Sequence, residues 1–156
     1  MFSKEEAQKL RKEFWTSFGD YTKFYSRKIG EPVIWMLYKT GIKGLELKFD
    51  LDLKTVKVAL EVSARNEERR FDIYAELDQY KAILETGLEE EIIWDDEFKL
   101  PEGKMVSRMY VELNDVKYHN RDNWPTIFKF MAENMYQLQS NFLDIHDLLK
   151  ERFGKY

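Results

Sequence analysis

Apolar side chains recur at spacings of three and four through residues 7–25, a period typical of one face of an amphipathic helix. Ser3 precedes this segment with the side chain of an N-cap, and acidic residues follow in the first turn, where the helix dipole favours anions. Gly30 and Pro32 interrupt the pattern. The pattern therefore predicts a helix from Ser3 to Gly30.

The period changes to two in four later segments, which come as two pairs. Apolar and polar residues alternate in each segment, as expected of strands with one buried and one solvated face. Asp52 begins a short polar turn within the first pair, and Pro101–Lys104 supplies turn residues within the second. The segments predict two antiparallel hairpins, formed by residues 45–51 with 56–62 and by residues 92–98 with 105–113.

A further helix follows each hairpin. Residues 66–86 have a helical apolar period, with Asn66 as an N-cap and Gly87 just past the end. The last helix starts near Asp122 or Asn123 and runs to about Phe153, so its roughly thirty residues are about 45 Å long at about 1.5 Å per residue. A helix of that length either covers the sheet and overhangs it or packs against a partner. Its apolar stripe comprises Ile127, Met131, Met135, Leu138, Phe142, Ile145, Leu149 and Phe153.

The predicted element order is α-β-β-α-β-β-α, which indicates an α+β fold. Its natural packing is a four-stranded, mainly antiparallel sheet with helices on one face and a long C-terminal helix. We find no linker or low-complexity segment, so we predict a single domain over residues 1–156. The pattern leaves the strand order open.

The composition narrows the class of protein. Aromatic residues make up 15% of the chain, whereas disordered chains contain few. The absence of cysteine excludes a disulfide scaffold, a cysteine-based zinc site and a cysteine nucleophile. The N-terminus has no secretory apolar region, and no segment reaches the roughly 18 apolar residues of a membrane span. We therefore expect a soluble, cytoplasmic protein without a membrane partner.

Basic and aromatic residues form a candidate nucleic-acid surface. The net charge is −4, but residues 1–48 hold ten Lys and Arg against six Asp and Glu. Arginine and aromatic side chains together can hold phosphates and stack on bases. Solvated faces, with Arg69 and Arg70 paired to nearby carboxylates, are the simpler interpretation. The candidates are Trp35, Tyr38, Lys39, Lys43, Arg65, Arg69 and Arg108, with Arg70 and Lys104 beside them.

Asp50 and Glu61 are the pair of carboxylates that suggests catalysis. Metal-dependent nucleases of the PD-(D/E)xK type use an Asp, a Glu and a Lys two residues after the Glu. Ser63 occupies that lysine position, and alternation places Glu61 on the solvated face of its strand. A nuclease is therefore the least favoured interpretation, and we predict no catalytic residue.

Three other groupings are weaker. The carboxylates of residues 95–97 point to alternating faces of a strand, and His119 and His146 have no partner at ligand spacing. Residues 38–44 look faintly like a phosphate cradle, but they precede a strand instead of following one, which favours a turn. We predict no metal site and no cofactor. Trp35, Trp94 and Tyr110 could line a small-molecule pocket.

Three motifs resemble those of a known family. They are Trp35 to Lys43 ahead of an alternating strand, Ser107-Arg108 in the fourth predicted strand, and Trp124-Pro125 after a polar segment. The chain resembles, from about Phe14 to about Leu149, a small bacterial family catalogued as domain of unknown function 4268. The resemblance implies that members occur alone or at the C-terminus of proteins whose N-terminal part resembles a restriction-type endonuclease. It implies no catalytic residues, because the family has no established activity.

Three hypotheses follow. The favoured one is a non-catalytic interaction or accessory module, linked to DNA restriction or defence, with the long last helix as a homodimer interface. The alternative is an accessory nucleic-acid-binding domain that uses the basic and aromatic face. The second alternative is a metal-dependent nuclease built on Asp50 and Glu61.

Overall fold

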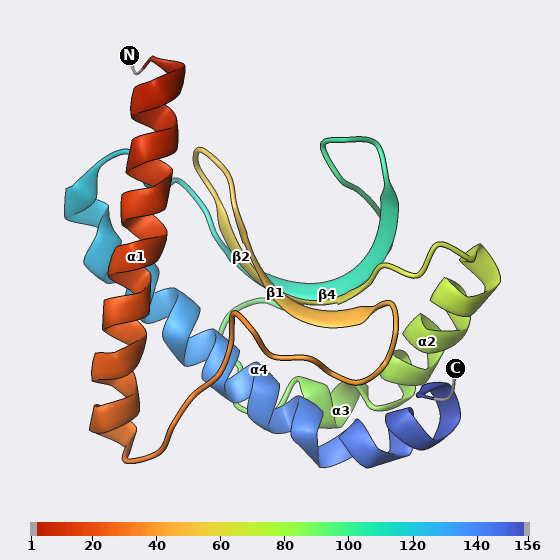
Figure 1. The fold of residues 1–156 in the computed structure, drawn as a ribbon. Coiled ribbons are helices and arrows are strands. Elements are labelled where there is room, and N and C mark those ends of the chain that lie inside the picture. Colours follow the sequence, from red (N-terminus) through yellow and green to blue (C-terminus); the bar gives the residue numbers. More distant parts are fainter. Residues whose placement is uncertain (1–2, 155–156) are drawn as a thin grey trace.

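Helix α1 (Lys4–Ile29) opens the fold in a computed structural model that describes residues 3–154 (Figure 1). The hydroxyl of Ser3 accepts a hydrogen bond from the backbone N–H of Glu6, whose carboxylate accepts one from the N–H of Ser3. This capping box satisfies two of the N–H groups that a helix start leaves without partners. Gly30 closes the helix in the left-handed conformation, with φ of 78°. The predicted first helix is confirmed.

Four strands form one antiparallel sheet. They are β1 (Leu45–Leu51), β2 (Val56–Val62), β3 (Ile93–Lys99) and β4 (Met105–Leu113). Their order in the sheet is β1-β2-β4-β3, so β2 and β4 lie at the centre. Both predicted hairpins are confirmed, and the pairing of β2 with β4 joins them into one sheet.

The segment predicted as one helix over residues 66–86 is two helices, α2 (Glu67–Gln79) and α3 (Lys81–Leu84). Tyr80 separates them. Its N–H donates to Leu77 O at the end of α2, and its carbonyl accepts hydrogen bonds at the start of α3. Asn66 caps α2 through its side-chain oxygen, as expected. Ile83, placed on the apolar face by its period, is 40% exposed.

The last helix, α4 (Trp124–Phe153), follows a single 3-10 turn, η1 (Arg121–Asn123). It runs diagonally beneath the sheet and, with α2 and α3, lies on the convex face of a strongly curved sheet (Figure 1). Helix α1 packs against α4 and reaches β1 through a contact between the rings of Phe18 and Phe49, whose centroids are 5.2 Å apart. No helix covers the concave face in the part of the chain described.

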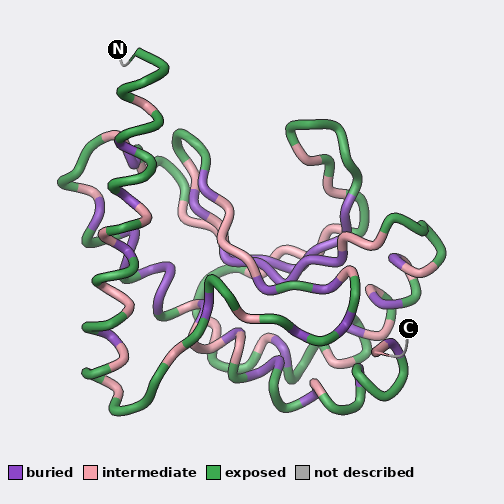
Figure 2. Tube along the Cα trace, in the orientation of Figure 1, coloured by how far each residue is buried: buried purple, intermediate pink, exposed green. Residues whose placement is uncertain are grey.

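The core lies between the sheet and α4, where buried residues are concentrated (Figure 2). Val58 and Leu60 of β2 are both 0% exposed. Every residue of the predicted α4 stripe is at most 8% exposed, so the stripe is the side of the helix that packs against the sheet. The outward side of the helix carries exposed carboxylates, at Asp144, Asp147 and Glu151. The stripe that suggested a homodimer is therefore buried within the chain itself.

The structure also bears on the membrane prediction. Within residues 3–154, every helix is too short or too polar to cross a bilayer.

Candidate functional site

The concave face of the sheet carries a buried ion pair between the two central strands. Arg108 of β4 lies opposite Glu61 of β2, and its guanidinium pairs with the Glu61 carboxylate. The side chain of Arg108 is 0% exposed and that of Glu61 is 1% exposed. Asp50 Oδ2 lies 3.0 Å from Arg108 Nη1, and Lys48 Nζ lies 3.3 Å from Glu61 Oε2. Two cations and two carboxylates thus compensate one another, which buried charges require.

A bulge in β3 places an aromatic ring over this ion pair. The pairing of β3 with β4 shifts by one residue between Asp95 and Phe98, and such a shift reverses the faces of the residues beyond it. The ring of Phe98 then lies over Arg108, with 4.1 Å between its centroid and Cζ. Arg70 of α2 holds the bulge, because its Nη1 donates to Asp96 O at 2.8 Å. The ring of Phe98 therefore shields the ion pair where no described helix does.

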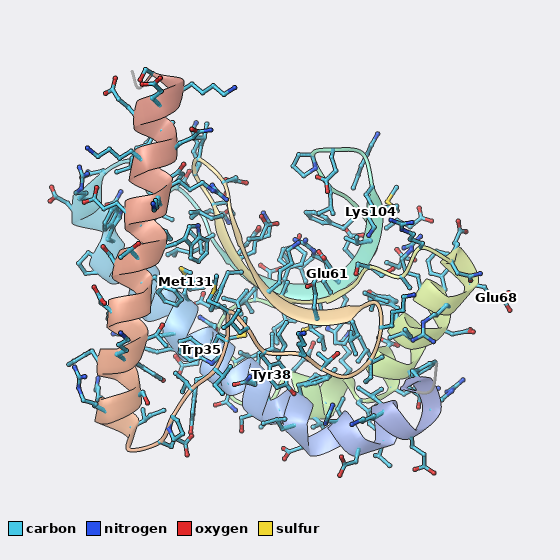
Figure 3. All side chains as sticks on the ribbon, in the orientation of Figure 1. Trp35, Tyr38, Glu61, Glu68, Lys104 and Met131 are labelled. Atoms are coloured by element: carbon cyan, nitrogen blue, oxygen red, sulfur yellow. The ribbon has the colours of Figure 1, made fainter. Side chains whose placement is uncertain are left out.

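Asp50 and Glu61, the carboxylates considered for a nuclease, lie on the same face of the sheet. The expectation that Glu61 is solvated is wrong, because the residue faces an arginine and is covered by neighbouring side chains. The guanidinium of Arg108 contacts both carboxylates and thus stands where a metal bound between them would lie. Lys48 supplies the lysine beside Glu61, from the neighbouring strand. Figure 3 shows Glu61 at the floor of the concave face.

The other groupings considered for chemistry have internal partners. Among residues 3–154, no three Asp, Glu or His side chains gather closely enough to hold a metal ion. The hydroxyl of Thr40 donates to Leu45 O at 2.7 Å and accepts from the N–H of Ile42 at 3.1 Å. Residues 38–44 therefore form the turn into β1, with Thr40 O also contacting His146 Nε2.

The seven residues considered for nucleic-acid contact separate in space. Trp35 is 4% exposed and stacks on Phe18 in the core. Trp35 and Tyr38 lie on the helix side of the sheet, away from Lys104 (Figure 3). Arg108 belongs to the buried ion pair, and Lys39 is exposed in the loop before β1. The remaining three, Lys43, Arg65 and Arg69, line one cleft together with Lys104.

This basic cleft has a volume of about 950 Å³. It lies among the start of β1, the N-terminus of α2, the C-terminus of α4 and the β3–β4 hairpin. Gly44 brings two of these segments together: its φ is 85°, and a Cβ there would lie 2.9 Å from the Cβ of Ala64. Lys43 precedes Gly44 and Arg65 follows Ala64, so the close approach places both cations at the same end of the first hairpin. An adjoining hollow of about 370 Å³ shares Arg65 and Lys104 with the cleft.

Arg69 holds the walls of the basic cleft together. Its Nη2 donates to Lys43 O at 2.9 Å and to Phe153 O at 3.1 Å, so α2 is tied to the start of β1 and to the end of α4. Its guanidinium also lies over the ring of Phe153, 5.9 Å from the centroid. Burial lowers the pKa of Arg69, although an arginine remains charged at neutral pH. Arg69 therefore positions Lys43, and its donors point toward carbonyl oxygens of the chain.

The three other cations of the cleft are not neutralised by the chain. Lys43, Arg65 and Lys104 form no ion pair with any residue of the described range 3–154. All three side chains are exposed. Two carboxylates, those of Glu68 and Asp72, also line the cleft, so its charge is mixed with a basic surplus. The arrangement can hold an anion by direct contact with ammonium and guanidinium groups.

Sequence reasoning missed part of both sites. It gave Lys48 no role, although this residue completes the charge network, and it considered Arg70 only as a surface cation although its side chain is buried. The signal for the network was present in the pattern, because opposite charges occupy the predicted solvated faces of both hairpins. The strand order was needed to set Glu61 against Arg108.

Comparisons with known proteins point to one family. The sequence profile of the family described as Domain of unknown function (DUF4268) matches residues 10–146. Searches of curated proteins and of solved structures found no significant match. The matched range includes both hairpins and all four cations of the basic cleft.

Proposed function

The chain belongs to the family Domain of unknown function (DUF4268), and we propose that it is a non-catalytic module that holds nucleic acid in the basic cleft. One observation carries this proposal: Lys43, Arg65 and Lys104 come from three separate segments and line one cleft without carboxylate partners among residues 3–154. Exposed basic residues are usually spread among acidic ones, so three that gather without pairing favour an anionic partner.

The electrostatics of the cleft suit phosphate groups. Lysine and arginine hold phosphate oxygens through charge-assisted hydrogen bonds, and each contact with a nucleic-acid backbone displaces a bound counterion. The whole chain carries a net charge of −4, so the attraction is local to the cleft. A local patch on an acidic protein suits an accessory contact better than high-affinity binding across the whole surface.

The concave face supports the non-catalytic half of the proposal. Two carboxylates that activate a metal must be open to the metal and to a phosphate. Asp50 and Glu61 instead contact Arg108, and Phe98 lies over that guanidinium. The chain itself supplies the positive charge that a metal would bring, which favours a structural role for the two carboxylates.

The favoured hypothesis from the sequence had two narrower parts, a link to DNA restriction or defence and a homodimer through α4. A link to DNA restriction or defence is consistent with a module that holds nucleic acid, and the resemblance implies such a link. A homodimer through α4 has no remaining support from the apolar stripe, because the stripe packs inside the chain. The proposal therefore treats the monomer as the binding unit.

Fluorescence anisotropy with a short labelled DNA duplex at low salt tests the proposal. We expect the wild-type chain to bind, and the triple variant K43A/R65A/K104A to lose most of that affinity. The matched control is K23A, which removes an exposed cation from α1 at the other end of the molecule (Figure 1). Absence of binding by the wild type, or equal losses in the triple variant and in K23A, would remove the cleft as the binding site.

A further inference from the structure

The basic cleft continues beyond its own boundary. The adjoining hollow of about 370 Å³ is separated from it only by residues that both share, Ala64, Arg65 and Lys104. Arg65 and Lys104 therefore stand between two hollows and can be reached from both. A compact ligand, such as a free phosphate, would fill one hollow and leave the other. A chain-like ligand can cross both and contact the same two cations on its way.

The cleft offers no stacking platform. Phe153 is the only aromatic residue among the described residues that line it, and this residue is 8% exposed. The guanidinium groups of Arg69 and Arg152 lie over its ring, 5.9 Å and 5.0 Å from the centroid. The exposed aromatic faces on which single-stranded nucleic acids stack their bases are therefore missing here.

The remaining lining is suited to backbone contacts and poorly suited to reading bases. Lys43 and Lys104 hold phosphates as point charges, and Arg65 can hold one through its guanidinium fork. Base reading needs an element that enters a groove, with Arg, Asn or Gln side chains aimed at base edges, whereas Arg65 lies in the loop between β2 and α2. Asn66, the amide side chain of the cleft, already accepts a hydrogen bond from Arg69 N as the cap of α2.

Resting on the proposed function, we infer that the partner is a double-stranded nucleic acid, held along its phosphate backbone across both hollows without regard to base sequence. A duplex presents a higher density of phosphate charge than a single strand, and its phosphates keep a fixed spacing. Three free cations from three segments of the chain can each contact one phosphate of that regular array. The number of backbone contacts is three, made by Lys43, Arg65 and Lys104.

The test compares duplexes of several unrelated sequences, the corresponding single strands and inorganic phosphate as competitor, all with the full wild-type chain. We expect affinities for the duplexes to agree within about threefold, single strands to bind roughly three- to tenfold more weakly, and millimolar phosphate not to compete. The logarithm of the duplex affinity should fall with the logarithm of salt concentration with a slope of about −2.7, for three contacts at about 0.9 each.

The outcomes separate this inference from the proposed function. Single strands that bind as tightly as duplexes, or a preference of more than about tenfold for one sequence, would overturn the inference and leave nucleic-acid binding in place. Displacement by phosphate alone would indicate a small-anion site instead. If no nucleic acid binds, the proposed function itself fails. Parallel titrations with DNA and RNA duplexes distinguish the two sources of double-stranded backbone.

Discussion

Arg108 and Glu61 lie directly opposite one another on the two central strands, and their side chains are 0% and 1% exposed on the one face of the sheet that no described helix covers. A charge that is buried on a face without a helix must be shielded from water by another side chain. Phe98 provides it, because the bulge in β3 turns this residue onto the concave face. The ion pair, the bulge and the ring thus form one unit, and its charges are not available for a metal or a phosphate.

We predict that R108A lowers the free energy of unfolding by about 3–5 kcal/mol, because it leaves the buried carboxylate of Glu61 with only Lys48 as an ionic partner. R108K should recover little of this loss, since one ammonium cannot bridge Glu61 and Asp50 as the guanidinium fork does. Urea denaturation measures both variants. The control is R121A, which breaks an exposed pair with Glu13 and should unfold close to the wild type. Equal midpoints for R108A and R121A would contradict the structural role of Arg108.

The left-handed backbone of Gly44 gives a second prediction. G44A adds the strain of a positive φ and a Cβ 2.9 Å from that of Ala64, whereas G103A adds only the strain, since a Cβ at Gly103 meets nothing within 4 Å. The strain alone costs about 1–2 kcal/mol. We expect G44A to be the more destabilising variant in thermal or urea unfolding, and also to weaken duplex binding by moving Lys43. If G103A is as harmful as G44A, the close approach of the two segments is not what shapes the cleft.

Arg69 should influence duplex binding only by holding Lys43 in position. R69M removes the hydrogen bonds to Lys43 O and Phe153 O, so we expect a loss of about 2 kcal/mol in stability and a weaker affinity for duplex. The salt slope of the remaining binding should stay at the wild-type value, because the donors of Arg69 point toward Lys43 O and Phe153 O and not toward a phosphate. A slope that falls by about one unit would make Arg69 a direct contact instead.

The carboxylates of the cleft allow a gain of affinity to be predicted. E68Q removes a negative charge that faces the same space as Lys43 and Arg65, so duplex binding at low salt should strengthen by roughly two- to fivefold. D20N removes an exposed carboxylate on α1, far from the cleft, and should have a much smaller effect. General damage to the fold cannot strengthen binding, so E68Q separates local electrostatics from loss of structure. An unchanged or weaker affinity in E68Q would argue against a ligand in the cleft.

Tyr74 provides a test by pH. Burial, together with the carboxylates of Asp96, Asp78 and Asp95, raises its pKa to about 12 from an ordinary value of 10.0. The folded state thus favours the neutral phenol, and the stability that this contributes is fully present below pH 10 and is lost as the pH rises through about 12. Several tyrosines have a raised pKa, so the tyrosinate absorbance of Y74F should lack one of the late-titrating groups that the wild type shows. A Y74F variant whose titration and stability match the wild type across that range would contradict the assignment.

The local elements were predictable because their signals are local. Periods of three to four and of two mark α1 and both hairpins, and Ser3 and Asn66 mark helix starts. The break at Tyr80 was not predictable, since the apolar period of residues 66–86 continues across it. The face of the sheet on which Phe98 lies was not predictable either. Strict alternation places Phe98 on the same face as Trp94, and the bulge turns it to the opposite face.

The sites depended on contacts between distant segments. Alternation assigns Glu61 and Arg108 to a solvated face, and only the pairing of β2 with β4 shows that they neutralise and cover one another. The basic residues were recognisable by type, but composition could not separate Lys43 and Arg65, which meet at the cleft, from the buried Arg108. The strand order and the close approach at Gly44 made that distinction.

The salt dependence of duplex binding, measured for the wild type and for K104A in parallel, shows most clearly whether the basic cleft holds phosphates. We expect the slope of log affinity against log salt to fall in magnitude by about 0.9 in K104A, from about 2.7 to about 1.8, because one of three phosphate contacts is lost. K23A should keep the wild-type slope. The same slope in K104A and the wild type, or no duplex binding by the wild type, would contradict the assignment of the basic cleft as a nucleic-acid site.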